Sequence, residues 1–126
     1  MTHAEFKEML ASLAEGGSKR KYEEVAAHFA ENVFYSDPLN YTFTSKTSLW
    51  RFFCDDDDHE QYCKFHDLIF DEDRQFGAAE YTYEGTYRYH GTVWINVDGN
   101  KIVSWREYQH QSTKTWGEFW KIKCPR

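Results

Sequence analysis

The chain has 126 residues, the size of one ordinary domain. Its net charge of −6 argues against a nucleic-acid binder, which usually needs a basic face. It also has no apolar run of about 18 residues that could span a membrane. Aromatic residues make up 19% of the chain, more than a disordered protein has or a small core needs. We therefore expect some of them to line a cavity or a subunit interface.

Three helices are predicted in the first half of the chain. The first begins at a capping box formed by Thr2 and Glu5. Its apolar residues recur every three or four positions until the glycine pair at 16–17, where the helix should end. The same spacing continues over about 18–32 and places Phe29 on the apolar stripe of a second helix that Ser18 could cap.

A short strand separates the second predicted helix from the third. Residues 33–36 are β-like in composition, and Asp37-Pro38 breaks that strand. A third, shorter helix starts near 45–47. It should stop at the acidic run 55–58, because carboxylates at a helix C-terminus oppose the macrodipole.

Only strands are predicted from residue 62 onward. They cover 62–70, 78–86, 87–97 and 101–112, with a hairpin turn at 98–100. Helices followed by a long antiparallel meander predict an α+β domain with the helices on one face of the sheet. A strongly curved sheet closed by helices makes a cone, and the core of a cone is often a pocket. Because no linker or repeat divides the chain, we expect a single domain over 1–126.

The cysteines indicate a reduced protein. The chain has an odd number of cysteines, and their spacing is not that of a zinc site; they are Cys54, Cys63 and Cys124. The polar N-terminus also lacks the apolar core of a signal peptide, so we expect a cytoplasmic location. His66 follows Cys63 by three positions, but in a strand the two side chains would point to opposite faces, which argues against thiol catalysis.

Three segments of the chain carry a family resemblance. They are 27–38, which ends in Asp37-Pro38, 77–83, and 89–108 with its glycine-containing turn. Together they resemble the nuclear transport factor 2-like (NTF2-like) superfamily and, within it, the SnoaL-like proteins. The resemblance implies a cone-shaped NTF2-like fold, with three N-terminal helices packed on a curved antiparallel β-sheet, and a homodimer formed through the sheet. Isomerases, cyclases, dehydratases, epoxide hydrolases and non-catalytic binding proteins all share this fold, so it does not define the activity.

Asp37 is the first candidate catalytic residue. In the steroid isomerase branch that this chain resembles, an Asp at the matching position is the base that moves a proton beside a carbonyl. A partly desolvated carboxylate at the mouth of an apolar cone suits that role. The alternative is a turn residue that only accepts hydrogen bonds from backbone amides. The isomerases' helix-one Tyr and late-strand acid have no counterpart here, and neither has the Asp-Arg-Asp cluster of the epoxide hydrolases.

Glu107 and His90 are the other catalytic candidates. By resemblance, Trp105 and Glu107 share the cavity face of the last strand while Arg106 faces away, but a register slip of one residue would exchange them. Glu107 could orient a polar substrate group or act as acid or base; the alternative is an ion pair with an arginine. His90, beside Gly91, could transfer protons near neutral pH, or could simply be a hydrogen-bonded strand histidine.

A wall of aromatic side chains, with two polar neighbours, is expected to bind the ligand. A flat, apolar or conjugated molecule would stack on such rings, and plain core packing is the alternative. The predicted substrate-binding residues are Tyr35, Trp50, Phe53, His66, Glu80, Tyr83, Trp94 and Trp105. His66, Glu80 and His90 could approach one another across strands, but no ligand spacing demands a metal, so we predict neither a metal nor a cofactor.

The acidic stretch over 55–73 is predicted to be a solvated rim that discourages anionic ligands. The whole sequence then predicts an enzyme without a cofactor that performs acid/base chemistry on a hydrophobic, carbonyl-bearing small molecule. Isomerisation, cyclisation and dehydration all fit this description. The alternative is a non-catalytic module of the same fold that binds a small ligand or dimerises.

Overall fold

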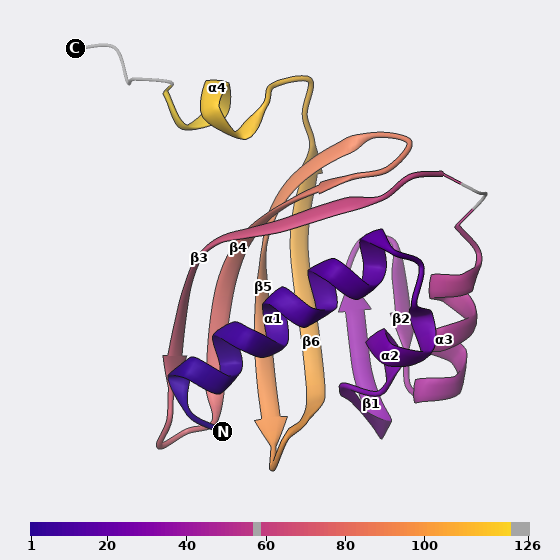
Figure 1. Ribbon diagram of the computed structural model, residues 1–126, viewed down its shortest axis with the longest axis vertical. Helices are drawn as coiled ribbons and strands as arrows, with labels where there is room; N and C mark the ends of the chain where they lie inside the picture. The colour runs from indigo at the N-terminus through magenta and orange to yellow at the C-terminus, as the bar shows by residue number, and fades with distance from the viewer. Residues whose placement is uncertain (57–58, 122–126) are drawn as a thin grey trace.

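The structure is a computed structural model that describes residues 1–56 and 59–121 (Figure 1). Its elements are α1 (His3–Ser18), α2 (Tyr22–Ala26), β1 (Phe29–Asp37), β2 (Tyr41–Phe43), α3 (Lys46–Cys54), β3 (Tyr62–Asp71), β4 (Phe76–Glu84), β5 (Arg88–Asp98), β6 (Lys101–Gln111) and α4 (Trp116–Trp120). The six strands form one curved sheet in the order β2-β1-β6-β5-β4-β3, and α1 lies across one face of it (Figure 1). All strand pairs are antiparallel except β1 with β6. The predicted α+β cone is therefore confirmed.

The first helix begins as predicted. Thr2 accepts a hydrogen bond from the Glu5 N–H at 3.1 Å, and the Glu5 carboxylate accepts one from the Thr2 N–H at 2.9 Å. The helix runs to Ser18, just past the glycine pair, and its apolar stripe, which includes Phe6 and Leu10, is buried against the sheet. Burial of this stripe joins the helix to the sheet and closes the cone.

The second helix is shorter than predicted. It ends at Ala26, and Phe29 opens β1 instead of lying on a helix. Ser18 does not cap it, because this residue belongs to α1 and its hydroxyl donates to the Glu15 carbonyl. Phe29 fits an apolar helix stripe and a buried strand equally well. Its pairing with Ile102 of β6, a contact over a long sequence distance, decides for the strand.

Two short elements were missed. β2 has three residues, too few to show an alternating pattern. The prediction of strands alone after residue 62 is wrong at α4, which begins at a second capping box formed by Thr115 and Glu118. The third helix is as predicted, since Ser45 caps α3 and the helix stops before Asp55. In the described part of the chain, no helix is long and apolar enough to cross a membrane.

The described acids of the predicted rim are exposed, except Asp56, which forms an ion pair with Arg20 at 3.3 Å. Asp57, Asp58 and Cys124 lie outside the described residues. The described acids of this stretch other than Asp56 are therefore solvated, as predicted.

Strand alternation separates the side chains of the sheet into two sets. The concave face, toward α1, holds the core, including Tyr35, Val93 and Trp105. In β6 the buried residues are Ile102, Trp105 and Glu107, while Arg106 is exposed. The register left open by the sequence is thus the one that directs Glu107 into the cone. His90 lies on the other, convex face, where it pairs across β4 and β6 with residues of that face.

Candidate functional site

A buried carboxylate, Glu107, lies among phenol and indole donors on the concave face. Tyr41 Oη donates to its Oε2 at 3.0 Å, and Trp105 Nε1 donates to its Oε1 at 2.9 Å. The Tyr35 hydroxyl donates to the same carboxylate. Only 5% of Glu107 is exposed. These donors come from β1, β2 and β6, so the pairing of distant strands creates their arrangement.

Asp37, at the end of β1, is a second buried carboxylate, 3% exposed. It accepts hydrogen bonds from the Leu39 N–H at 3.2 Å and from Asn40 Nδ2 at 2.7 Å, as in the turn role weighed above. It also accepts one from Gln109 Nε2 of β6 at 3.4 Å. Asp37 therefore closes the turn before β2 and, in addition, contacts the polar side chains of the last strand.

Tyr81 and Gln109 connect the two carboxylates. Tyr81 Oη donates to Gln109 Oε1 at 2.6 Å and lies 3.4 Å from Glu107 Oε2. Since Gln109 uses its oxygen toward Tyr81, its nitrogen faces Asp37. We call Asp37, Tyr41, Tyr81, Glu107 and Gln109 the carboxylate network. Its polar atoms form a continuous path from one carboxyl group to the other.

The surroundings of Glu107 shift the pKa of its carboxyl upward. Burial raises the pKa of this carboxyl, and the charge of Asp37 raises it further, whereas the hydrogen bonds from Tyr35, Trp105 and Tyr41 oppose the rise. Burial also raises the pKa values of the Tyr35, Tyr41 and Tyr81 phenols. These hydroxyl groups therefore keep their protons and remain hydrogen-bond donors. Two neighbouring carboxyl groups in unlike environments are typical of an acid/base pair.

Aromatic rings surround the network. Tyr35 stacks on Trp105 with ring centroids 5.5 Å apart, and Phe53 of α3 meets Tyr35 edge-on at 5.9 Å. Tyr41 packs against Phe52 of the same helix at 4.9 Å. Phe52 is 37% exposed, so this aromatic wall extends from the buried network to the surface.

The predicted site residues are divided between the two faces of the sheet. The concave face brings together Tyr35, Asp37, Phe53, Tyr83, Trp105 and Glu107. His66, Glu80, His90 and Trp94 lie on the convex face, contrary to the expectation that they would join the pocket. Trp50 is 36% exposed on α3, where its neighbours Phe52 and Phe53 make the ring contacts.

His90 belongs to a separate hydrogen-bond chain on the convex face. Thr82 Oγ1 lies 2.7 Å from His66 Nε2 and 2.9 Å from His90 Nδ1, and His90 Nε2 lies 2.8 Å from the Lys114 carbonyl. Because a carbonyl only accepts, His90 Nε2 donates the hydrogen bond to Lys114. Trp116 of α4 stacks on His66 with centroids 3.8 Å apart.

This chain of hydrogen bonds holds α4 on the sheet, and the sheet separates His90 from Asp37 and Glu107. The alternation of strand side chains is the physical reason: His90 is paired with Thr82 rather than Tyr81. Among residues 1–56 and 59–121, no three His, Cys, Asp or Glu side chains lie together so that they could hold a metal ion.

Sequence reasoning did not name Tyr41 or Tyr81 as site residues. Tyr81 lies two positions before Tyr83 in one strand, so the two side chains share a face and Tyr81 could have been included with it. Tyr41 lies on β2, which is too short to leave a pattern, and its contact with Glu107 spans 66 positions.

No protein-family model matches the chain, and no curated protein sequence matches it significantly. Solved structures do match its fold. An NTF2-like protein of unknown function from Cytophaga hutchinsonii has a TM-score of 0.70 and 8% identity, over 82% of this chain and 88% of that one. A protein of unknown function with a cystatin-like fold from Methylobium petroleophilum has a TM-score of 0.78 and 15% identity, over 93% and 82%.

A protein with a ketosteroid isomerase-like fold from Catenulispora acidiphila, in complex with trimethylamine, has a TM-score of 0.70 and 14% identity. The match covers 80% of this chain and 84% of that one. At such identities the similarity concerns the fold and leaves the activity open. The predicted NTF2-like fold is thereby confirmed.

Proposed function

We propose that the protein is a cofactor-free enzyme that performs acid/base chemistry on a hydrophobic, carbonyl-bearing small molecule, by isomerisation, cyclisation or dehydration. The observation that carries this proposal is Glu107, a buried carboxyl with a raised pKa beside the second carboxyl of Asp37. A carboxyl with a raised pKa holds its proton more firmly and suits a proton donor, and we assign the carboxyl group of Asp37 beside it as the proton acceptor.

The roles follow from the donors around each group. Asp37 takes a proton from the carbon beside the substrate carbonyl, and the electrons of the broken C–H bond form an enolate. The phenols of Tyr41 and Tyr81, which keep their hydrogens, donate to the enolate oxygen as it gains negative charge. Glu107 or the protonated Asp37 then returns a proton to another carbon or to a leaving oxygen.

The comparisons support a small ligand in this fold. The Catenulispora acidiphila protein holds trimethylamine, and the aromatic wall of this chain offers flat faces to a larger apolar molecule. We also propose a cytoplasmic location, which the free thiols of Cys54 and Cys63 support.

Ring opening of 5-nitrobenzisoxazole tests the proposed base without knowledge of the natural substrate. A base removes the ring C–H proton, the N–O bond breaks, and a coloured nitrophenolate forms. We expect saturable turnover by the protein and a loss of about 100-fold or more in Asp37→Asn, because the base is removed. Phenolate absorbance gives the rate.

Asp98→Asn is the matched control, since Asp98 is exposed at the end of β5 and should leave the rate unchanged. Equal rates for the protein and Asp37→Asn would contradict the assigned base. If the wild-type protein bound 2-naphthol but did not turn over 5-nitrobenzisoxazole, it would be better described as a non-catalytic module that binds a small ligand.

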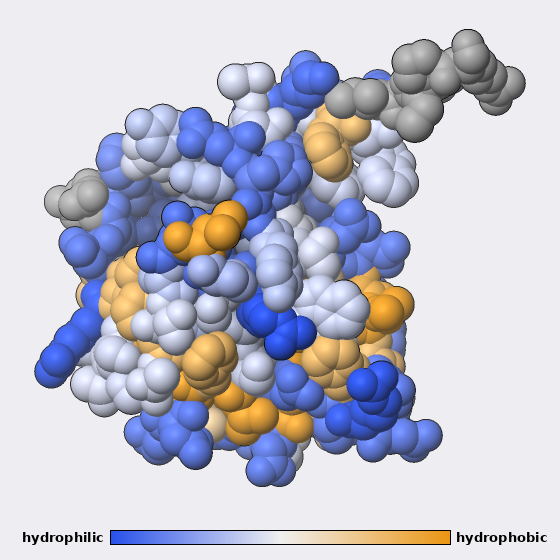
Figure 2. All heavy atoms as spheres, turned by 180° about the vertical axis from the view of Figure 1, so that it is seen from behind, coloured by the Kyte–Doolittle hydropathy of each residue, from blue (hydrophilic) through white to orange (hydrophobic). Residues whose placement is uncertain are grey.

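We further propose a homodimer formed through the convex face. Figure 2 views the sheet from the side opposite α1 and shows hydrophobic patches among hydrophilic side chains. Exposed apolar residues on this face include Ile69 at 70%, Trp94 at 40% and Tyr108 at 50% exposed.

Light scattering should give twice the chain mass of 15.1 kDa at micromolar concentration. Trp94→Glu should shift it to one chain mass.

Leu39→Glu is the control for the dimer, because Leu39 is 90% exposed in the turn before β2, away from the convex face. A wild-type protein that scatters as a single chain would refute the homodimer.

A further inference from the structure

Three residues of the concave face lie in one row across neighbouring strands. Tyr81 of β4 is paired with Gly91 of β5, and Gly91 is paired with Gln109 of β6. Neighbouring strands lie about 4.8 Å apart, so the backbones of Tyr81 and Gln109 are separated by about 10 Å. The Tyr81 side chain crosses this distance, and its Oη donates to Gln109 Oε1 at 2.6 Å. A Cβ at Gly91 would lie 2.9 Å from Tyr81 Oη and 2.8 Å from Gln109 Cβ, so the missing side chain makes this contact possible.

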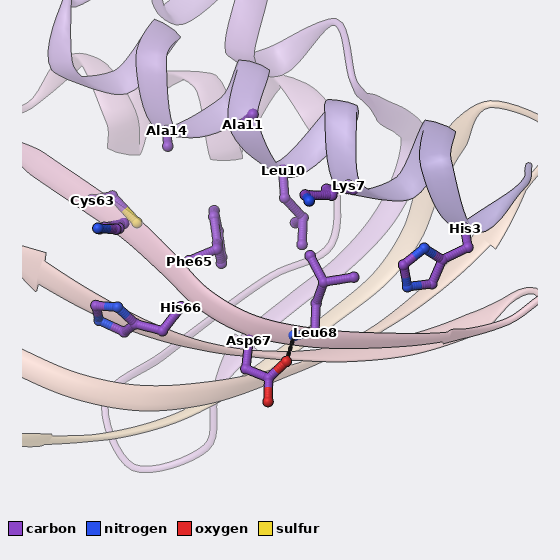
Figure 3. Close-up of a pocket in the computed structure, with 11 residues that line it drawn as sticks. His3, Lys7, Leu10, Ala11, Ala14, Cys63, Phe65, His66, Asp67 and Leu68 are labelled. Atoms are coloured by element: carbon purple, nitrogen blue, oxygen red, sulfur yellow. Dashed lines mark hydrogen bonds between the residues drawn. The ribbon is translucent and has the colours of Figure 1, made fainter. Parts of the chain in front are cut away.

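The ring of Tyr81 is held in place from the neighbouring strand. Phe65 of β3 points toward α1 (Figure 3) and packs edge-on against the Tyr81 ring, with centroids 6.0 Å apart. Only 5% of Tyr81 is exposed, and burial raises the pKa of its phenol, so the hydroxyl keeps its proton. Tyr81 therefore presents a fixed hydrogen-bond donor to Gln109.

This donor decides which way the amide of Gln109 points. Because the amide oxygen accepts from Tyr81, the amide nitrogen, which can only donate, is directed at Asp37 Oδ2 at 3.4 Å. The reverse orientation would place the amide nitrogen against the Tyr81 hydroxyl and the amide oxygen against the oxygen of a carboxylate, where two acceptors repel. Gln109 can therefore offer Asp37 only an N–H donor.

The hydrogen bonds of Asp37 are divided unevenly between its two oxygens. Oδ2 accepts from Asn40 Nδ2 at 2.7 Å and from Gln109 Nε2, whereas Oδ1 accepts one hydrogen bond from the described residues, that of the Leu39 N–H at 3.2 Å. Each oxygen of a carboxylate has two lone-pair sites. Both sites of Oδ2 are therefore occupied, and one site of Oδ1 remains open.

We propose that Gln109 is a positioning residue for the base. Together with Asn40 it occupies Oδ2 of Asp37, so that Oδ1 is the oxygen that takes the substrate proton. This role rests on the proposed function, in which Asp37 removes a proton from the carbon beside a carbonyl. The proton moves from carbon to Oδ1, and the electrons of the broken C–H bond stay on the substrate as the enolate. Gln109 acts through Asp37 and exchanges no proton itself.

Gln109→Glu tests this role through the pH dependence of 5-nitrobenzisoxazole turnover. The variant keeps an oxygen for Tyr81 but replaces the N–H donor with a second carboxyl beside Asp37 Oδ2. Two such carboxyls share one proton and lose their protons in two steps. Since like charges disfavour the second step, the acid limb of kcat against pH should extend to higher pH by about one unit or more. A side chain that only filled space would change the rate without moving this limb.

Gln111→Glu is the matched control, because Gln111 is exposed at the end of the same strand and gains the same charge. Its pH profile should match that of wild type. Gln109→Met has a similar volume and no charge, so it decides the question if Gln109→Glu fails to fold. It should move the acid limb up by about half a pH unit, because one hydrogen bond to the carboxylate is lost. Equal profiles for wild type and the folded Gln109 variants would overturn the role, and so would an equal shift in Gln111→Glu.

NMR of isotope-labelled carboxyl carbons separates this role from the proposed function. The signal of the Asp37 carboxyl should change from one titration step in wild type to two in Gln109→Glu, whether or not a substrate is turned over. Wild type without turnover but with this change would remove the proposed function and leave Gln109 as the partner of Asp37. An unchanged titration curve would overturn the positioning role whatever the rates are.

Discussion

Glu107→Ala is expected to lower the free energy of unfolding by about 3 kcal/mol or more, because several buried donors lose their acceptor. Trp105 Nε1, Tyr41 Oη and the Tyr35 hydroxyl all donate to this carboxylate, and a cavity would replace it. Glu107→Gln keeps the volume and one acceptor oxygen, so it should cost about 1.5 kcal/mol at most. Urea unfolding of the three proteins measures the difference.

A comparison of wild type with Glu107→Gln also tests the raised pKa of Glu107. A carboxyl whose folded pKa lies above its ordinary value of 4.5 stabilises the fold fully only below that value. The contribution is lost as the pH rises through the folded pKa. Wild type should therefore lose stability relative to Glu107→Gln above pH 4.5, by about 1.4 kcal/mol per pH unit until the carboxyl is ionised.

A stability difference between wild type and Glu107→Gln that stays constant with pH would show that burial does not perturb this carboxyl. If Glu107→Ala were as stable as Glu107→Gln, the donors around the carboxylate would have found other partners. The first result would remove the observation on which the proposed acid/base pair depends, and the second would limit the carboxylate to a minor structural role.

Gly77→Ala should destabilise the domain by about 3 kcal/mol, because the strand has no room for a methyl group there. An added Cβ would lie 2.6 Å from the Ile69 carbonyl oxygen and 2.8 Å from Phe6 Cζ. The first of these atoms is backbone paired within the sheet, and the second is the buried anchor of α1. Neither can move without disturbing the contact between helix and sheet.

Gly91→Ala should be destabilising to a similar extent and should also disturb the network. Its Cβ would lie 2.6 Å from the Tyr108 carbonyl oxygen and 2.9 Å from Tyr81 Oη, so Tyr81 must move away from Gln109. Turnover of 5-nitrobenzisoxazole should fall together with stability.

Gly17→Ala is the matched control for both glycine variants. A Cβ at Gly17 meets no atom within 4 Å, and the residue lies in α1, so the change should be neutral or stabilising by up to about 1 kcal/mol. Thermal unfolding of the three variants provides the comparison. Equal midpoints for Gly77→Ala and Gly17→Ala would contradict the tight packing between α1 and the sheet.

The predictions of the fold succeeded where the signal was local. The capping box at Thr2 and the start of the third helix near 45–47 both depend on residues a few positions apart, and both are found in the structure. Phe29 was assigned to a helix because its local spacing suits one, and only its strand partner Ile102 excludes that assignment.

The candidate site was predictable only in part. Resemblance and strand alternation selected Asp37 and Glu107, and the structure connects these two side chains through Tyr81 and Gln109. His90 was grouped with them because its residue type suits proton transfer. The residue type alone does not determine on which face of the sheet a side chain lies, and His90 lies on the convex face, opposite Asp37 and Glu107.

The sequence by itself determined α1, α3 and the meander of strands from β3 to β6, and therefore the cone, since periodicity, caps and turns are properties of neighbouring residues. It also determined that Trp105 and Glu107 share a face, because the side-chain period of a strand is two. Only the tertiary structure decided that this face is the buried one. The parallel pairing of β1 with β6 and the addition of β2 bring Tyr35 and Tyr41 to Glu107. The free energy of these contacts comes from segments far apart in the chain, so neither segment's own sequence shows a pattern that predicts them.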